Sequence, residues 1–110
     1  MSQNIYTDTF AADGDSVIYQ FTRGTDNAQI EPVAFTLSGT WSSVTATLYI
    51  CTNTGESPLV FAAVPNAAYT ADTGDKWDIP TGCYFKVTVS ASGSPIPALT
   101  LRLKGDIKPA

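Results

Sequence analysis

The chain lacks the residues from which most active sites are built. Its 110 residues contain no histidine, no Cys-x-x-Cys pair, no glycine-rich phosphate loop and no paired-carboxylate motif. A serine nucleophile needs a neighbouring base, usually histidine, and nothing in the spacing favours a serine paired with Lys86. We therefore expect a protein that is not an enzyme and that carries no cofactor.

Basic residues and long apolar runs are also scarce. The six lysines and arginines are scattered, and the net charge is −4. Because nucleic-acid binding needs clustered Lys and Arg, we expect no nucleic-acid partner. No stretch approaches the ~18 apolar residues of a membrane span, so we expect no membrane partner either. The chain opens without a basic segment followed by an apolar run, and we expect it to be made, and first to fold, in a reducing cytoplasm.

Charged residues make up only 15% of the chain, against roughly 25% in an average soluble domain. Serine and threonine take their place. A surface of this kind loses little side-chain entropy when it is buried, which suits a packed interface. Threonine also favours strands, and strand preference alone can account for much of this composition.

What the chain does have is alternation of apolar and polar residues, the period of a strand with one buried face. The alternating segments are Ser16–Arg23, Val33–Ser38, Val44–Thr52, Cys83–Ala91 and Ala98–Lys104. Turn signals recur about every ten residues, as in sandwiches and jelly rolls. We predict an all-β, two-sheet antiparallel sandwich, jelly-roll-like, with about eight strands and no helix. A single domain is expected over residues 1–104, followed by a flexible C-terminal tail at residues 105–110.

Two local patterns carry further predictions. Asp13-Gly14-Asp15 predicts a hairpin that joins Ile5–Phe10 to Ser16–Arg23, because the Asp-Gly step supplies the positive φ of such a turn. In the middle of the chain, Leu59–Val64 and Ala67–Ala71 are each compatible with a short strand, with a turn between them.

The two cysteines are predicted to be free thiols. Alternation places Cys51 on the outer face of its strand and Cys83 on the core face of another. Side chains on opposite faces cannot meet the geometry of a disulfide.

Three aspartates, Asp72, Asp75 and Asp78, flank Gly74 and raise the question of a cation site, since calcium takes clustered carboxylate oxygens. The spacing does not match an EF-hand loop, and Asp and Gly are also the commonest turn formers. A structural turn is the favoured interpretation. We predict no metal site, and cation binding at this turn stays open.

Aromatic residues on an outward face are candidates for an interface. Trp41 begins a strand on the same face as the threonines that follow it. The predicted interface residues are Tyr6 on the first strand, and Trp41, Thr45, Thr47 and Tyr49 on one outward face. Aromatic residues at a rim serve both protein interfaces and carbohydrate surfaces. The other interpretation is that Trp41 and Trp77 cap the ends of the sandwich core.

Four segments carry a resemblance to a known family. They are FAADGDSVIYQF (10–21), FTLSGTWSSVTATLYICTNTG (35–55), WDIPTGCYFKVTVSASGSP (77–95) and ALTLRLKG (98–105). The pattern they form extends from residue 10 to residue 105, over nearly the whole chain, which resembles the small β-sandwich capsid decoration, or cement, proteins of tailed bacteriophages. Within that group the size and single domain are similar to the "staple" proteins of short-tailed enteric phages such as epsilon15.

The resemblance implies a non-enzymatic virion structural protein that binds and stabilises an assembled phage capsid. Its place would be the capsid exterior, and its partner the major capsid protein. Copies would form a dimer or bridge capsomers, with the first strand and the terminal tail as arms that add to a neighbour's sheet. The alternative functions are a tail, neck or baseplate component, or a host-surface glycan-binding module that depends on Trp41 or Trp77.

Overall fold

The computed structural model describes residues 4–11, 14–22, 30–41, 44–91 and 98–110, and every regular element within them is a strand. In chain order the strands are β1 (Asn4–Phe10), β2 (Gly14–Asp15), β3 (Tyr19–Phe21), β4 (Ile30–Thr40), β5 (Val44–Cys51), β6 (Phe61–Tyr69), β7 (Thr73–Pro80), β8 (Tyr84–Ala91), β9 (Ala98–Gly105) and β10 (Ile107–Pro109). Within these residues there is no helix long and apolar enough to cross a membrane.

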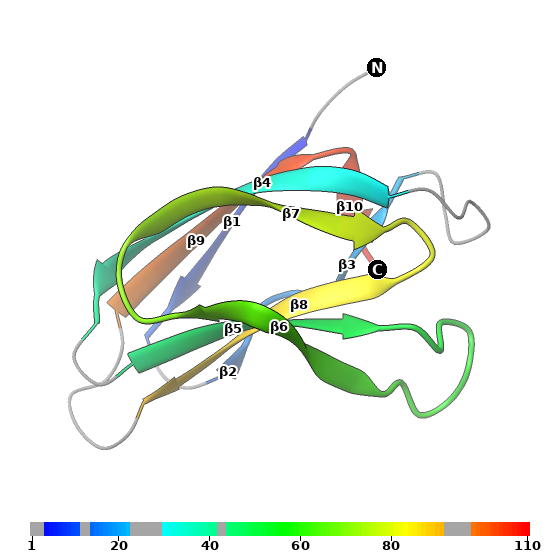
Figure 1. The fold of residues 1–110 in the computed structure, drawn as a ribbon, viewed down its shortest axis with the longest axis horizontal. Helices are drawn as coiled ribbons and strands as arrows, with labels where there is room; N and C mark the ends of the chain where they lie inside the picture. The colour runs from blue at the N-terminus through cyan, green and yellow to red at the C-terminus, as the bar shows by residue number, and fades with distance from the viewer. Residues whose placement is uncertain (1–3, 12–13, 23–29, 42–43, 92–97) are drawn as a thin grey trace.

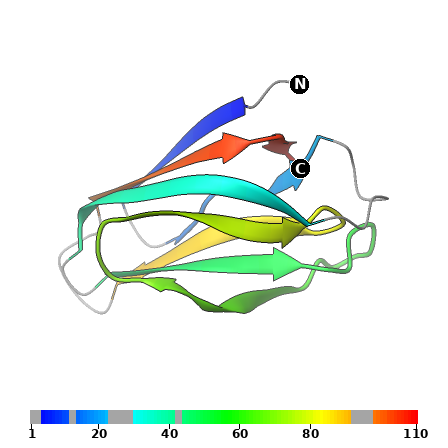
Figure 2. The same cartoon turned by 45° about the horizontal axis from the view of Figure 1, so that its top comes forward.

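The strands form two antiparallel sheets that pack face to face (Figure 1). Sheet A has the order β1-β9-β4-β7, and sheet B has the order β10-β3-β8-β5-β6, with β2 beside β8. Figure 2 shows the two layers from a turned view, with cyan β4 in one layer and green β5 in the other. The predicted all-β, two-sheet antiparallel sandwich is confirmed, with the two short strands β2 and β10 beyond the eight or so expected.

The order of strand pairs along the chain is nested. β1 pairs with β9, β3 with β8, β4 with β7 and β5 with β6. This nesting results when a long two-stranded ribbon is rolled up. The β4–β9 pair then joins the two halves of sheet A, and the β5–β8 pair joins the two halves of sheet B. Eight strands rolled in this way make a jelly roll.

The core lies between the sheets and takes the inward-facing residue of each strand. Its buried residues in sheet A include Val33, Phe35 and Leu37 of β4 and Leu99, Leu101 and Leu103 of β9. This spacing is the period of two that alternation predicts. Phe35 also stacks on Trp77 of β7, with ring centroids 3.9 Å apart and ring planes 10° from parallel.

The predicted hairpin at Asp13-Gly14-Asp15 is wrong, although Asp13 itself lies outside the described residues. β1 pairs with β9 in sheet A, whereas β2 and β3 pair with β8 in sheet B. The chain therefore crosses from one sheet to the other between β1 and β2. This crossing lets Phe10 and Tyr19 enter the core from opposite sheets, and both are buried.

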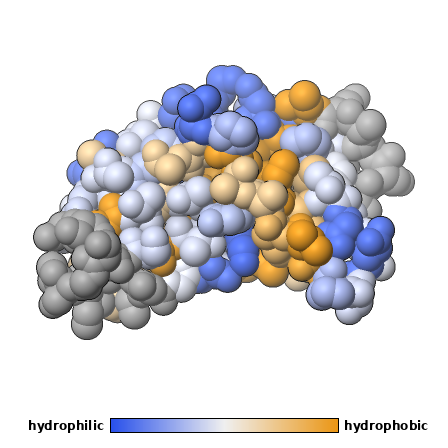
Figure 3. Space-filling view, turned by 60° about the horizontal axis from the view of Figure 1, so that its bottom comes forward, coloured by the Kyte–Doolittle hydropathy of each residue, from blue (hydrophilic) through white to orange (hydrophobic). Residues whose placement is uncertain are grey.

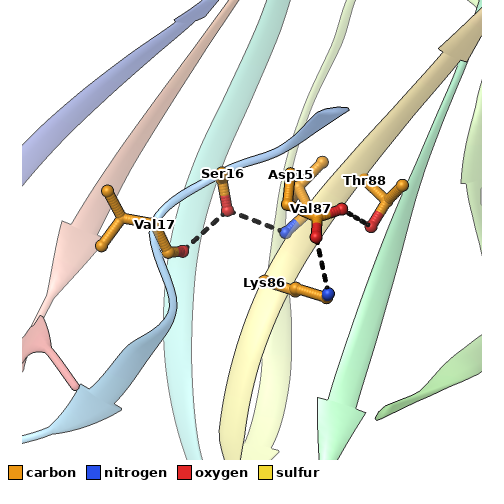
Figure 4. A network of polar contacts seen from close by, with 6 residues as sticks. All are labelled: Asp15, Ser16, Val17, Lys86, Val87 and Thr88. Carbon is orange, nitrogen blue, oxygen red and sulfur yellow. Dashed lines mark hydrogen bonds and ion pairs between the residues drawn. The ribbon is translucent and has the colours of Figure 1, made fainter. Parts of the chain in front are cut away.

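The segment that begins at Ser16, predicted as one strand, is interrupted (Figure 4). The Ser16 hydroxyl accepts a hydrogen bond from the Val87 N–H at 2.9 Å and donates to the Val17 carbonyl at 2.8 Å. The Ser16 N–H donates to the Val87 carbonyl at 2.7 Å. These bonds hold the chain on β8 while it bends, and β3 begins only at Tyr19.

The middle of the chain forms longer strands than predicted. β6 runs through Pro65 and Asn66, with Asn66 in the left-handed region at φ 62° and a register shift against β5. Because β6 lies at the edge of sheet B, the missing N–H of Pro65 removes no ladder bond from a central strand. β7 begins at Thr73, so Gly74 lies in a strand rather than in the predicted turn.

The C-terminal residues form a strand and not a flexible tail. β10 pairs with β3, and Ile107 is fully buried, with 0% of its surface exposed. The Asn4 side-chain amide donates to the Ile107 carbonyl at 2.8 Å, and the Ala110 N–H donates to the Ile18 carbonyl at 2.8 Å. The prediction of a loose end at residues 105–110 is wrong because Ile107 completes the core.

Both cysteines are free and buried. Cys83 belongs to the core cluster, where burial raises the pKa of its thiol. Cys51 pairs in register with Phe61 and Tyr84 and lies outside that cluster. Its thiol donates to Asn53 Oδ1 at 2.9 Å. The prediction of two free thiols is confirmed, but Cys51 is covered where an exposed outer face was expected.

Candidate interaction surface

The outward-facing residues of sheet B form one broad side of the molecule. Thr45, Thr47 and Tyr49 of β5 are half-buried there, on the face that alternation predicts. Their register partners on β8 are, respectively, Ser90, Thr88 and Lys86. Paired residues of an antiparallel ladder point to the same side. The six side chains therefore form two adjacent rows, and all but Lys86 end in a hydroxyl group.

An apolar patch adjoins these rows where β6 begins. Phe61 is half-buried and Ala63 is exposed on this side, and Val60, just before β6, is 64% exposed. Ala63 pairs with Tyr49, so the patch is continuous with the row on β5. Figure 3 views the molecule from this side and shows hydrophobic residues gathered toward one end of it. Exposed apolar surface beside rows of hydroxyl groups makes this end of sheet B a candidate interaction site.

The charges beside these rows, Asp15 and Lys86, pair with each other (Figure 4). Lys86 Nζ lies 2.8 Å from Asp15 Oδ2, and the Thr88 hydroxyl donates to Asp15 Oδ1 at 2.8 Å. The hydrogen bond from Lys86 and then that from Thr88 lower the pKa of Asp15. Lys86 Nζ also lies 4.5 Å from the centroid of the Phe61 ring, within cation–π range. A partner that covers this network does not have to desolvate an unpaired charge.

The remaining predicted interface residues lie elsewhere. Tyr6 is in sheet A and faces the core side, where its ring centroid is 5.3 Å from that of Tyr19. Trp41 is half-buried at the end of β4, and its indole N–H donates to Asp72 Oδ1 at 2.7 Å. The same oxygen accepts the Gly39 N–H at 3.1 Å. Of the five predicted residues, only the three on β5 therefore share the outer face of sheet B.

Two features of this surface are absent from the predicted set. Phe61 and Ala63 lie within the unbroken apolar run Leu59–Val64, so alternation assigns them no face. The ion pair joins Asp15 to Lys86 across 71 residues. No local pattern predicts a pairing over that distance in the chain.

A hollow of about 270 Å³ opens between β6 and β7, where the edges of the two sheets face each other. Trp77 lies in its wall but is only 6% exposed. Its indole N–H donates to the Tyr69 hydroxyl at 2.9 Å, and its ring face stacks on Phe35. A sugar needs an open aromatic face on which to stack. Trp77 is therefore a core residue, in accord with the capping interpretation of this tryptophan.

The three aspartates considered for a cation make contacts within the protein. Asp72 Oδ1 accepts the indole N–H of Trp41, and Asp75 Oδ1 accepts the Lys76 N–H at 2.8 Å. Asp78 forms an exposed ion pair with Lys76 at 3.2 Å. In the part of the chain that the structure describes, no three His, Cys, Asp or Glu residues gather closely enough to hold a metal ion.

The outer side of sheet A has a different character. Arg102 and Lys104 are exposed there, and within the described residues neither makes a hydrogen bond or an ion pair. With Ile5, which is 61% exposed, they line a shallow hollow of about 230 Å³. A partner that covered this side would have to compensate two positive charges. On the outer side of sheet B the corresponding cation, Lys108 of β10, is separated from β8 by β3 and so lies away from the rows on β5 and β8.

Comparisons with known proteins bear on the fold. No protein-family model matches the chain, and no curated protein matches it. Among solved structures, the chain is similar to the mitogen derived from Yersinia pseudotuberculosis, with 15% identity, a TM-score of 0.54, and coverage of 99% of this chain and 98% of that one. It is also similar to part of the structure of infectious bursal disease virus, Gx strain, with 12% identity and a TM-score of 0.37. That match covers 96% of this chain and 34% of the viral chain.

The mitogen supports the two-sheet fold over the whole length of the chain, and at 15% identity it supports the fold alone. Neither comparison shows a phage decoration family. The function is therefore argued from the surface.

Proposed function

We propose that the protein is a non-enzymatic virion structural protein that binds the outside of an assembled phage capsid and stabilises it. The attachment site in this proposal is the outer face of sheet B, and the partner is the major capsid protein. The observation that carries the proposal is the apolar patch beside a row of hydroxyl-bearing residues, on a face whose nearest charges already pair with each other.

The physical chemistry of this face suits contact with another protein. Thr45, Thr47 and Ser90 have short side chains that lose little entropy on burial. Phe61 and Ala63 offer apolar area that is still in contact with water. A shell displays many identical sites, so a modest contact per copy is enough when copies bind together. Each attached copy adds contacts that must break before the shell opens.

The experiment is co-sedimentation of purified variants with undecorated phage shells. Thr45→Asp with Thr47→Asp places two carboxylates in the centre of the proposed contact, and we expect binding to shells to be lost while the fold is kept. The matched control is Thr36→Asp with Thr100→Asp, which adds the same charge to the outer side of sheet A. We expect the control to bind as the unchanged protein does.

The opposite result would overturn the attachment face. If the sheet B variant binds shells normally and the sheet A variant does not, the contact lies on the side of Arg102 and Lys104. If no variant binds shells and the unchanged protein does not bind either, capsid decoration fails. The glycan-binding alternative then rests on Trp41, since Trp77 is stacked in the core.

A further inference from the structure

Strand β1 is an edge of sheet A, and apart from the inward Asp8, whose carboxylate accepts a hydrogen bond from Tyr19, it lacks the features that keep edges from pairing. Its seven residues pair with β9 without a register shift and contain no proline, glycine or lysine. Ile5, Thr7 and Thr9 are exposed along its outer face. A regular edge strand of this length presents a row of N–H and C=O groups on which another strand can be built.

The other edges that the structure describes are protected. β6 contains Pro65 and the left-handed Asn66. In β7 the Asp75 carboxylate binds a backbone N–H, and the strand ends at Pro80. β10 has three residues, one of which is Pro109. Proline, irregular backbone and short length are the usual means of blocking an edge, so β1 stands apart.

We propose that β1 pairs antiparallel with β1 of a second copy, centred on Thr7. This register is the one that pairs all seven residues, since Thr7 is the middle of Asn4–Phe10. It places Tyr6 of one copy opposite Asp8 of the other. The Tyr6 hydroxyl makes no hydrogen bond within the described residues, and Asp8 uses one carboxylate oxygen to accept from Tyr19 at 2.6 Å. A centre at Asp8 would instead set two carboxylates opposite each other, which is destabilising.

The symmetry of this pairing has a consequence for attachment. Directly paired residues of an antiparallel ladder point to the same side, so the two-fold axis is perpendicular to the joined sheet. The outer faces of sheet B in the two copies then point the same way. The pairing itself does not depend on the proposed function, but its benefit for attachment rests on that function. Two faces that approach one shell together bind more tightly than either face alone.

A pairing of one strand buries less area than a standard interface of about 1,600 Å². The dimer is therefore expected to be weak in solution, and a covalent trap is the sensitive test. Thr7→Cys places a thiol opposite the same thiol of the second copy. The Cα separation of about 4.5–5.5 Å in such pairs allows a disulfide to form between them. Cys51 and Cys83 are 0% and 6% exposed, so these buried thiols compete little with the introduced thiol for disulfide formation.

The controls for the trap depend on register. Thr9→Cys alone should form little disulfide-linked dimer, because position 9 faces position 5 of the other copy. A mixture of Thr9→Cys and Ile5→Cys should form a mixed dimer. Equal oxidation of Thr7→Cys and Thr9→Cys, at a rate set only by exposure, overturns the proposed pairing.

A second pair of variants tests the same register without a disulfide. Ile5→Lys with Thr9→Glu sets opposite charges across the pair, whereas Ile5→Lys with Thr9→Lys sets like charges. Starting from −4, adding one of each leaves −4, and adding two lysines gives −2. Overall repulsion is therefore smaller in the double-lysine variant. By sedimentation equilibrium we nevertheless expect it to dimerise about tenfold more weakly, and equal or stronger dimerisation contradicts the proposal.

Discussion

Replacing Gly39 by alanine tests how closely β4 and β9 approach each other. Gly39 has a φ of 141°, a conformation that L-residues with a Cβ rarely adopt. A Cβ built there would lie 2.0 Å from the carbonyl oxygen of Ala98 and 3.0 Å from Leu99 Cα. These are backbone atoms of the neighbouring strand, so no side chain can turn away to make room.

The expected cost follows from these two effects. The backbone strain of a non-glycine residue at such a φ is on the order of 1–2 kcal/mol. The contact with Ala98 forces β4 away from β9 and disturbs the hydrogen bond from the Gly39 N–H to Asp72. We expect Gly39→Ala to lower the free energy of unfolding by about 3 kcal/mol. With a urea m-value of about 2 kcal/mol/M, the midpoint falls by about 1.5 M.

The assay is urea unfolding followed by tryptophan fluorescence, and Gly74→Ala is the matched control. A Cβ at Gly74 would lie 3.6 Å from Thr36 Cγ2, an ordinary van der Waals contact. Gly74→Ala is expected to change the free energy of unfolding by less than about 0.5 kcal/mol. If both variants unfold at the same midpoint, the close approach of β4 to β9 at Gly39 is wrong.

Three further predictions concern the C-terminus and two ionisable groups. Ile107→Ala should lower the free energy of unfolding by about 3 kcal/mol, because the side chain is fully buried; a loose tail would show no change in urea unfolding. The pKa of Asp15 is lowered by Lys86, so its contribution to stability is present above the ordinary value of 3.8 and is lost as pH falls through the lowered pKa. The free energies of unfolding of wild type and Asp15→Asn should therefore converge as pH falls from about 5 to about 2. Burial, and then the hydrogen bond to Asp8, raise the pKa of Tyr19 above its ordinary value of 10.0, so this contribution is present below pH 10.0 and is lost as pH rises toward the raised pKa. Tyr19→Phe should be less stable at neutral pH and should lose less stability than wild type above pH 10.0, with equal slopes contradicting the burial of the hydroxyl.

Local pattern was enough to predict the strands and their buried faces where one face meets the core. The predicted strand Val33–Ser38 lies inside β4, and the predicted Ala98–Lys104 inside β9. In both strands the alternate residues are buried as predicted. The outward position of Thr45 and Thr47 follows from the same rule.

Strand pairing was beyond local pattern, because it depends on contacts between distant segments. β1 pairs with β9, which begins at Ala98, and not with the segment that follows it in the chain. Ile107 is a single apolar residue two positions after Gly105, and a single residue gives no periodic signal. It is nevertheless fully buried. Single apolar residues near a terminus become core residues only when the fold brings a strand such as β3 beside them.

The candidate surface could be predicted only in part, because it too depends on contacts between segments that are distant in the chain. Tyr6 was predicted as an interface residue, but in β1 the exposed set is Ile5, Thr7 and Thr9, and the inward set includes the charged Asp8. An inward carboxylate is tolerated because the Tyr19 hydroxyl donates to it, a contact that alternation does not predict. The pairing of the charges beside β5 depends on an ion pair whose two partners are distant in the chain.

The most direct test of capsid attachment is a titration of the purified protein against expanded, undecorated phage shells, followed by sedimentation to saturation. We predict saturable binding at a copy number that matches a symmetry of the lattice, with binding lost in the Thr45→Asp, Thr47→Asp variant. Failure of the unchanged protein to sediment with shells at any concentration would contradict it.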